Sequence, residues 1–253
     1  MKLLYIECFA GLTFGMLPGA LLDMGLQDTR QWCAALQAAG CRIVQASRAP
    51  KSGIDACGLF VVPADDAPKS LSELESQMFA ATLSARGKRL CTGVLDKLSA
   101  AGVTQLSAQQ AAEAVCDVAG TALLLDAVRP DMCMASEVRF GSVDAAAQAV
   151  LDAGRLPCRP KEDAAPLSAV GAALIAQLAQ EYGPLPNMQI LHIGYGAGGG
   201  SNDKPLLLRA VLGRTDDTLG DLECSMELLF EQAVWESRTI EIFAPQAHLA
   251  KGW

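Results

Sequence analysis

The sequence predicts a mixed α/β (α+β) fold, a mixed sheet with flanking helices. Three observations predict this class. Apolar runs typical of strands alternate irregularly with segments of helical periodicity, hydrophobic residues make up 51% of the 253 residues, and charged residues make up only 19%. Such a composition supports a sizeable packed core and argues against disorder. The irregular alternation favours a mixed sheet over a strictly doubly wound one.

Periodicity and turn residues define the elements of the first half. Residues 2–8 predict a strand, and the helical spacing that follows ends at Gly25, a suitable helix cap. Asp28 can open a second helix that ends near Gly40. We then expect strands over 41–47 and 55–63, a polar linker over 64–70 and a helical region over 71–128. The last helix of that region, about 107–128, has a face almost free of charge, which predicts deep burial.

The second half continues the same mixture. We expect a strand over 132–140, a short helix over 143–153, an irregular proline-rich loop over 155–166, a helix over 167–182, and strands over 189–195 and 205–212. Residues 1–214 are predicted to form one α/β domain, followed by a short tail over 215–253.

Charge and hydropathy exclude several classes of function. The formal net charge is −8 and no Lys/Arg stripe is present, so nucleic-acid binding is not expected. No stretch reaches the roughly 18 apolar residues that a membrane helix needs. Glu7 interrupts the apolar N-terminal run, which therefore predicts a strand and not a signal peptide. We expect a cytoplasmic protein.

Nine cysteines are present, without a CxxC pair. Most lie in apolar, periodic contexts, where free cysteine behaves as a small buried hydrophobe, and reduced structural thiols are the simplest interpretation. A metal site assembled from scattered cysteines such as Cys8, Cys116 or Cys158 is the alternative. The two histidines, His192 and His248, have no acidic or cysteine neighbour at ligand spacing, so a local histidine-based metal site is not supported.

A glycine-rich stretch over residues 194–200 follows a predicted strand, as a phosphate-binding turn does. It leads into another strand, however, and carries no P-loop lysine. By itself this pattern favours a hairpin connection, with phosphate binding as the alternative. Residue patterns alone therefore name no function.

Several blocks, in order and spacing, resemble one protein family. They are Glu7-Cys8-Phe9-Ala10-Gly11, Gly15-Met16, residues 19–25, Asp117-Val118-Ala119-Gly120, residues 182–188, Ile193-Gly194-Tyr195-Gly196-Ala197-Gly198, then Asp203, Arg209 and Gly213. From residue 2 to about 213 the chain resembles the LarC nickel-insertion family. LarC proteins insert nickel into a pyridinium bis-thiocarboxylate mononucleotide, consuming CTP with a divalent metal.

The resemblance implies a LarC N-terminal-domain fold and nickel or a nickel-pincer nucleotide as ligand. Carried onto the matching positions, it implies a nucleotide site made by Gly194, Tyr195, Gly196, Gly198, Asp203 and Arg209. It implies Glu7, Cys8 and Asp117 as metal ligands, and it assigns no catalytic residue.

Departures from the family pattern are as informative as the matches. Gly15 replaces the family's Gly-Asp-Met aspartate, and Phe14 stands where a small glycine is usual. A His-Phe-His-Glu motif is replaced by residues 104–110, and Thr-Pro-Thr-Gly reads Ser168-Ala169-Val170-Gly171. The histidine-rich tract is reduced to the linker 64–68, and a His-Gly-Leu-Leu-Pro loop to residues 154–158. Because imidazole and carboxylate are suitable nickel ligands, we expect a retained scaffold with altered nickel chemistry.

Three hypotheses stay open. The chain is a nickel-insertion protein or metallochaperone with an altered site, a pseudoenzyme that acts as scaffold or binding subunit, or a nucleotide-binding protein that uses residues 194–200. Residues 222–245 weakly resemble the start of the family's C-terminal domain, and the sequence ends at Trp253. We therefore expect a CTP-dependent step to need a separate polypeptide, in a homo-oligomer or hetero-complex, and this chain alone to be inactive.

Overall fold

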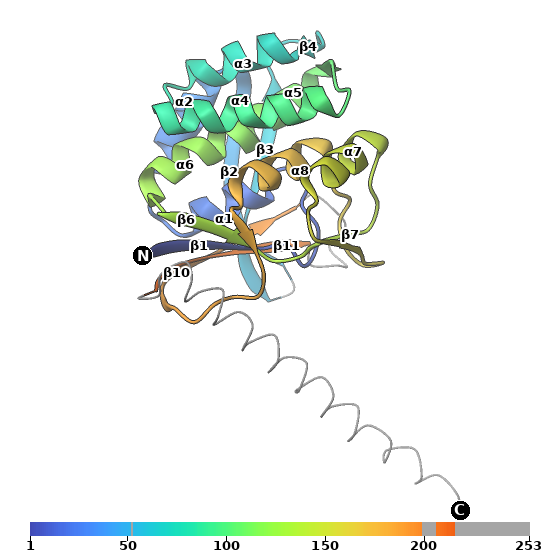
Figure 1. Cartoon of the computed structure of the whole chain (residues 1–253). Coiled ribbons are helices and arrows are strands. Elements are labelled where there is room, and N and C mark those ends of the chain that lie inside the picture. Colours follow the sequence, from blue (N-terminus) through green and yellow to red (C-terminus); the bar gives the residue numbers. More distant parts are fainter. Residues whose placement is uncertain (52, 199–205, 216–253) are drawn as a thin grey trace, which may run out of the picture.

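A seven-stranded mixed sheet forms the centre of the protein, with strand order β2-β3-β10-β11-β1-β6-β9 (Figure 1). The computed structural model describes residues 1–51, 53–198 and 206–215. The strands of this sheet are β1 (Lys2–Glu7), β2 (Cys41–Lys51), β3 (Ile54–Pro63), β6 (Met132–Ala135), β9 (Glu181–Tyr182), β10 (Gln189–Ala197) and β11 (Leu207–Arg214). β1 is parallel to β6 and antiparallel to β11, and β10 is parallel to β3 and antiparallel to β11. The predicted mixed sheet is confirmed.

Helices gather on one side of this sheet (Figure 1). They are α1 (Met16–Asp23), α2 (Thr29–Ala38), α3 (Leu71–Ala80), α4 (Ala85–Ala100), α5 (Ala108–Ala114), α6 (Gly120–Val128), α7 (Ala145–Gly154) and α8 (Ala169–Leu178). A π-helical turn, Val115–Ala119, joins α5 to α6 and is called the π-turn below. Two small ribbons pair β4 (Lys69–Ser70) with β5 (Gln105–Leu106) and β7 (Val138–Phe140) with β8 (Cys158–Pro160).

Both faces of β1 are buried, which explains its continuous apolar sequence. Leu4 and Ile6 point into the main core under the helices. Leu3 and Tyr5 point to the other face, where residues of the connection between β9 and β10 cover them. The Tyr5 hydroxyl donates a hydrogen bond to the Gly183 carbonyl at 2.8 Å, which fastens that connection to the strand.

Glycines allow α1 to lie directly on β10. A Cβ atom at Gly194 would collide with the Ala20 carbonyl oxygen, and one at Gly196 with the Met16 carbonyl oxygen. At the end of α1, the Asp23 carboxylate accepts the Tyr195 N–H at 3.0 Å. The glycine block of β10 therefore has a packing role.

Most predicted elements of the chain are present. The helix expected over 107–128 runs through α5, the π-turn and α6, and every residue of the π-turn is buried. The expected strand over 132–140 is split into β6 and β7, and the expected loop over 155–166 contains β8. The helix expected over 167–182 ends at Leu178, because Ala179 turns extended and leads into β9. Apart from Thr215, the expected tail lies outside the described residues, so the domain boundary stays a prediction.

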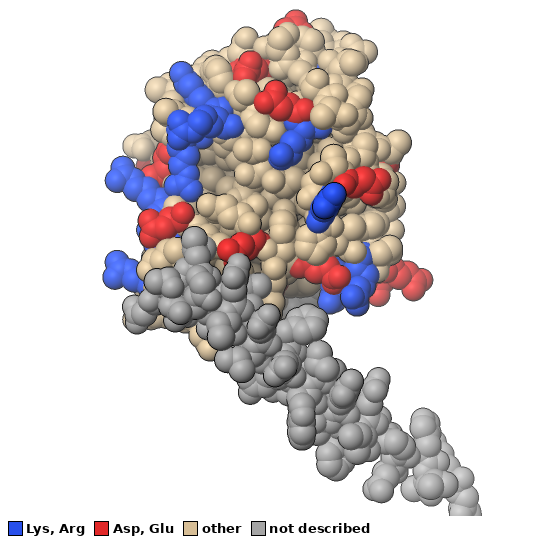
Figure 2. Space-filling view, viewed as in Figure 1, with Lys and Arg blue, Asp and Glu red and all other residues tan. Residues whose placement is uncertain are grey.

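The surface charge and the lengths of the helices were also compared with the expectations from the sequence. On the face in Figure 2, most of the surface is uncharged, Lys and Arg side chains lie mainly toward the left side, and Asp and Glu side chains are scattered. Of the helices in the described part of the chain, none combines the length and apolar composition required to cross a bilayer.

Candidate functional site

A cleft of about 420 Å³ opens where four distant segments of the chain meet. Its walls come from the loop before α1, the stretch from the connection after α4 through α5 into the π-turn, the start of α7 and the start of α8. The residues that line it with polar or aromatic groups are Thr13, Phe14, Thr104, Gln105, Gln110, Glu113, Asp117, Asp144 and Ser168. The volume lies in the range that small-molecule sites occupy in proteins.

Asp117 is the buried acid of this cleft. It lies in the π-turn, an irregularity common at functional sites, and only 6% of the residue is exposed. Its Oδ1 accepts the Gly15 N–H at 2.8 Å. Gly15 has φ +79°, a left-handed conformation that favours glycine, so this N–H is held toward the acid by a turn that other residues would strain.

Burial raises the pKa of Asp117 to about 8; the hydrogen bond from Gly15 opposes this shift, and the Glu113 charge adds to it. The carboxyl is therefore mostly protonated at neutral pH. A cation that enters the cleft would favour the ionised form, so binding would release the proton.

The cleft is acidic. Glu113 and Asp144 add two more carboxyl groups, and the described residues that line it include no Lys, Arg or His. The Asp144 carboxylate also caps α7 by accepting the Ala147 N–H at 2.7 Å. Such a lining attracts cations or positively charged rings and repels phosphate.

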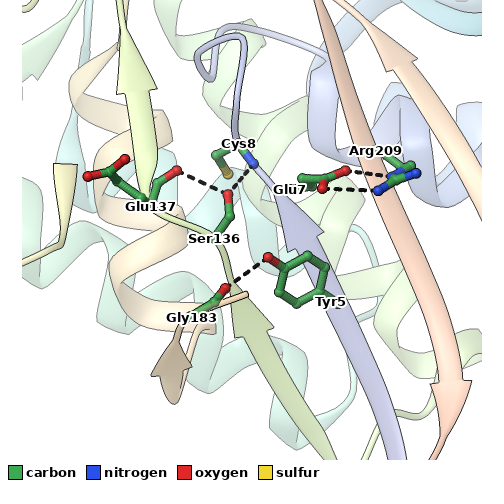
Figure 3. A network of polar contacts seen from close by, with 7 residues as sticks. All are labelled: Tyr5, Glu7, Cys8, Ser136, Glu137, Gly183 and Arg209. Atoms are coloured by element: carbon green, nitrogen blue, oxygen red, sulfur yellow. Dashed lines mark hydrogen bonds and ion pairs between the residues drawn. The ribbon is translucent and has the colours of Figure 1, made fainter. Parts of the chain in front are cut away.

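The end of β1 forms a second, partly buried polar group (Figure 3). Arg209 on β11 donates from Nε to Glu7 Oε2 at 2.5 Å and from Nη2 to Glu7 Oε1 at 3.0 Å. The neighbouring Cys8 is fully buried, and burial raises the pKa of its thiol to about 12. The Cys8 N–H donates to the Ser136 Oγ at 2.8 Å. The Glu7 carboxylate is thus paired with the Arg209 guanidinium, and the Cys8 thiol stays protonated.

Comparison with known proteins identifies the family. The sequence model of the nickel insertion protein family matches residues 4–232, most of the chain. The chain belongs to the nickel insertion protein family.

Individual relatives agree with this assignment. Proteins of Citrifermentans bemidjiense and Syntrophotalea carbinolica, both provisionally named nickel insertion proteins, are 29% and 28% identical over 88% and 98% of this chain. The pyridinium-3,5-bisthiocarboxylic acid mononucleotide nickel insertion protein of Acetivibrio thermocellus is 25% identical over 90% of this chain. The matches span 64%, 65% and 64% of those three relatives, so the chain covers just under two thirds of their length. No solved structure matches the chain.

Several of the positions predicted to depart from the family pattern lie at the cleft of Asp117. Phe14, residues 104–106, Gln110 and Ser168 all line it, and Gly15 donates to its buried acid. In the sequence these positions lie up to about 150 residues apart. In the fold they surround one space. Asp117 is predicted from the sequence, whereas Glu113 and Asp144 are not, because no family motif marks them.

The predicted metal ligands are not gathered at one point. Glu7 and Cys8 lie at the end of β1, whereas Asp117 lies in the π-turn. Within residues 1–51, 53–198 and 206–215, no group of three or more His, Cys, Asp or Glu side chains is placed to hold a metal ion. His192 lies in β10, and His248 lies outside the described residues. Metal binding by these residues stays a prediction.

The predicted nucleotide residues are also divided. Gly194 and Gly196 are covered by α1, while the Gly198 N–H donates to the Leu206 carbonyl at 2.9 Å. Tyr195 and Arg209 are paired neighbours on β10 and β11, and their side chains interact. Asp203 lies outside the described residues. The described glycine backbone is thus engaged in packing and pairing, and nucleotide binding over residues 194–200 stays a hypothesis.

Proposed function

We propose that this chain takes part in nickel insertion into a pyridinium bis-thiocarboxylate mononucleotide, as a binding subunit whose own nickel site is altered. The observation that carries the proposal is the convergence of the family's segments on the acidic cleft of Asp117. Family membership and the name of the Acetivibrio relative supply the reaction.

The lining of the cleft suits a pyridinium ring. Such a ring is a flat cation, and Asp117, Glu113 and Asp144 provide carboxyl groups that attract it. The Phe14 ring, placed where the family has a small residue, adds an aromatic surface for stacking or cation–π contact. The absence of basic groups from the described lining directs the phosphate of the mononucleotide away from the cleft.

Nickel is the cargo of this reaction and needs more donors than the cleft offers. Carboxylate oxygens alone suit Mg²⁺, Ca²⁺ or Mn²⁺ better than Ni²⁺, which prefers imidazole and thiolate. We therefore propose that the thiocarboxylates of the nucleotide, or a partner polypeptide, complete the coordination. Asp117 would release its proton and offer one oxygen. This favours a binding subunit or scaffold over a chain that carries nickel alone.

Two accompanying proposals concern the cellular compartment and the partner of this chain. All eight cysteines in the described part of the chain are free thiols, as a reducing compartment keeps them, so we propose a cytoplasmic protein. We also propose a partner polypeptide for the CTP-dependent step.

The test uses the full chain with Ni²⁺ alone, with pyridinium-3,5-bisthiocarboxylic acid mononucleotide alone, and with both. We expect calorimetry to detect binding of the nucleotide to the chain. Elemental analysis should find near-stoichiometric nickel only when Ni²⁺ and the nucleotide are both present. Asp117→Asn should weaken nucleotide binding about tenfold or more, because it removes a buried charge partner. The matched control, Asp66→Asn, removes an exposed carboxylate in a loop and should change nothing.

Two outcomes would contradict the proposal. Near-stoichiometric nickel without nucleotide would make the chain an independent nickel-insertion protein with an altered site. A stoichiometric complex with another polypeptide, without any nucleotide binding, would make it a scaffold only.

A further inference from the structure

Two thiols meet in the core where β2 begins. Cys41 is the first residue of β2, and its Sγ lies 3.8 Å from the carbonyl oxygen of Ala112 on α5. Cys116 lies in the π-turn, four residues after Ala112, so its side chain emerges on the same side of the helix. The Cys41 and Cys116 thiols lie close enough to change each other's ionisation. The two sulfur atoms are therefore direct neighbours, although 75 positions separate them in the sequence.

Both thiols of the pair are buried, and their pKa values are shifted in opposite directions. Cys41 is 2% exposed and Cys116 is fully buried. The neighbouring Cys116 thiol lowers the pKa of Cys41, whereas the Cys41 thiol and burial hold the pKa of Cys116 well above its usual range. Burial raises the pKa of the unpaired core thiol Cys91 to about 12. Cys41 and Cys116 thus form a pair of neighbouring buried thiols between β2 and the π-turn.

A narrow crevice reaches the surroundings of the pair. It has a volume of about 10 Å³, and its lining includes Gly40 and Val115, the residues that precede the two cysteines, together with Ala112. That volume holds about one water molecule. Hydrogen peroxide is only slightly larger than water, whereas a tripeptide disulfide cannot enter.

We propose that Cys41 and Cys116 are a redox site that hydrogen peroxide closes into a disulfide. The Cys41 thiolate attacks one peroxide oxygen, the O–O bond breaks, and the leaving hydroxide takes up a proton to become water. Cys41 is then a sulfenic acid. The Cys116 sulfur attacks the Cys41 sulfur, the S–O bond breaks, and the departing hydroxide takes the Cys116 proton. Two thiols and one peroxide give one disulfide and two waters.

The apolar surroundings favour a disulfide over a bound soft metal ion. A disulfide is neutral, whereas two thiolates around a monovalent ion leave a net negative charge in the core, and burying that charge is costly. The cross-link would join β2 to the π-turn, one residue before Asp117. Oxidation would therefore fix the segment that carries the acid of the cleft, and the proposal stands whether or not the cleft binds the nucleotide.

The experiment treats the reduced full chain with hydrogen peroxide and follows intact mass and peptide maps. We expect the loss of two hydrogen atoms and one linked peptide pair, joining Cys41 to Cys116. Cys41→Ser and Cys116→Ser should each abolish the link, whereas Cys91→Ser, which alters a fully buried thiol outside the pair, should keep it. Oxidised glutathione should form the link about tenfold or more slowly, because its access is blocked.

The wild-type map decides the question even if a serine variant fails to fold. A chain that keeps both thiols reduced while peroxide oxidises other cysteines would overturn the proposal. A peroxide-formed link between any other two cysteines would overturn it as well.

Discussion

The protonated Asp117 makes the stability of the protein depend on pH in a way that one substitution should remove. Its folded-state pKa of about 8 lies above the ordinary value of 3.8. Between those values the folded chain holds a proton that the unfolded chain has lost. The contribution of the Asp117 carboxyl to the free energy of unfolding is therefore fully present below about pH 4 and declines as pH rises toward 8.

The magnitude follows from the shift. Each pH unit in this window is worth about 1.4 kcal/mol, so the interval from pH 5 to pH 8 corresponds to ~4 kcal/mol. The residue is only 6% exposed, so solvent screening reduces this little. Asparagine has nearly the same shape, keeps an oxygen for the Gly15 N–H and carries no titratable proton. Asp117→Asn should thus unfold at similar urea concentration near pH 5 and be more stable than wild type by about 4 kcal/mol near pH 8.

Urea unfolding at pH 5, 6.5 and 8, followed by the fluorescence of the tryptophans, measures this difference. Asp66→Asn is the matched control, because it also removes one carboxylate but from an exposed loop. The free-energy gap between Asp117→Asn and wild type should widen with pH, and the control gap should stay flat. A gap for Asp117→Asn that changes by less than about 1 kcal/mol between pH 5 and pH 8 would mean that the folded chain does not hold the Asp117 proton at neutral pH.

Three further predictions concern packing and polar contacts. Gly196→Ala should destabilise the protein by about 1–3 kcal/mol or more, since the new Cβ meets the backbone of α1. Gly58→Ala, whose Cβ meets only ordinary contacts, is the control and should cost less than ~1 kcal/mol. Thermal melts of the two variants measure the difference. Glu7→Gln should cost about 1–3 kcal/mol by weakening the paired hydrogen bonds to Arg209, and a double-mutant cycle with Arg209→Met should show coupling. The buried Thr121 hydroxyl has no hydrogen-bond partner among the described residues, so Thr121→Val should stabilise the fold by about 1 kcal/mol in urea titrations, and a loss of stability would count against this.

The fold was largely predictable because its signals are local. The N-terminal strand, the first two helices and the long buried helix follow from apolar spacing and capping residues. Ser70 and Ser107 illustrate why helix starts are readable, since each forms a capping box with the residue three positions later. Strand order was not predictable, because it depends on which distant strands share a core.

The candidate site was only partly predictable. Asp117 was singled out through the family resemblance, but its neighbours Glu113 and Asp144 come from other segments and join it only in three dimensions. The glycines at 194 and 196 show a different limit. A glycine indicates that something approaches the backbone closely, and the sequence does not say whether that is a phosphate or, as here, a helix.

The π-turn has a consequence for chain length. A π-helical turn is an α-helix with one residue inserted, and one residue of α-helix corresponds to about 100° of rotation. The wide turn absorbs that rotation, so deleting a single residue between 115 and 119 would restore regular α-helix and leave α6 close to its present orientation. The Gly120 carbonyl would still reach the Trp32 indole N–H, which it accepts at 3.0 Å. The local change would fall on Asp117, whose Oδ1 accepts the Gly15 N–H at 2.8 Å from within the turn. The extra residue therefore sets the position of the buried acid and leaves the packing of α6 to the residues around it.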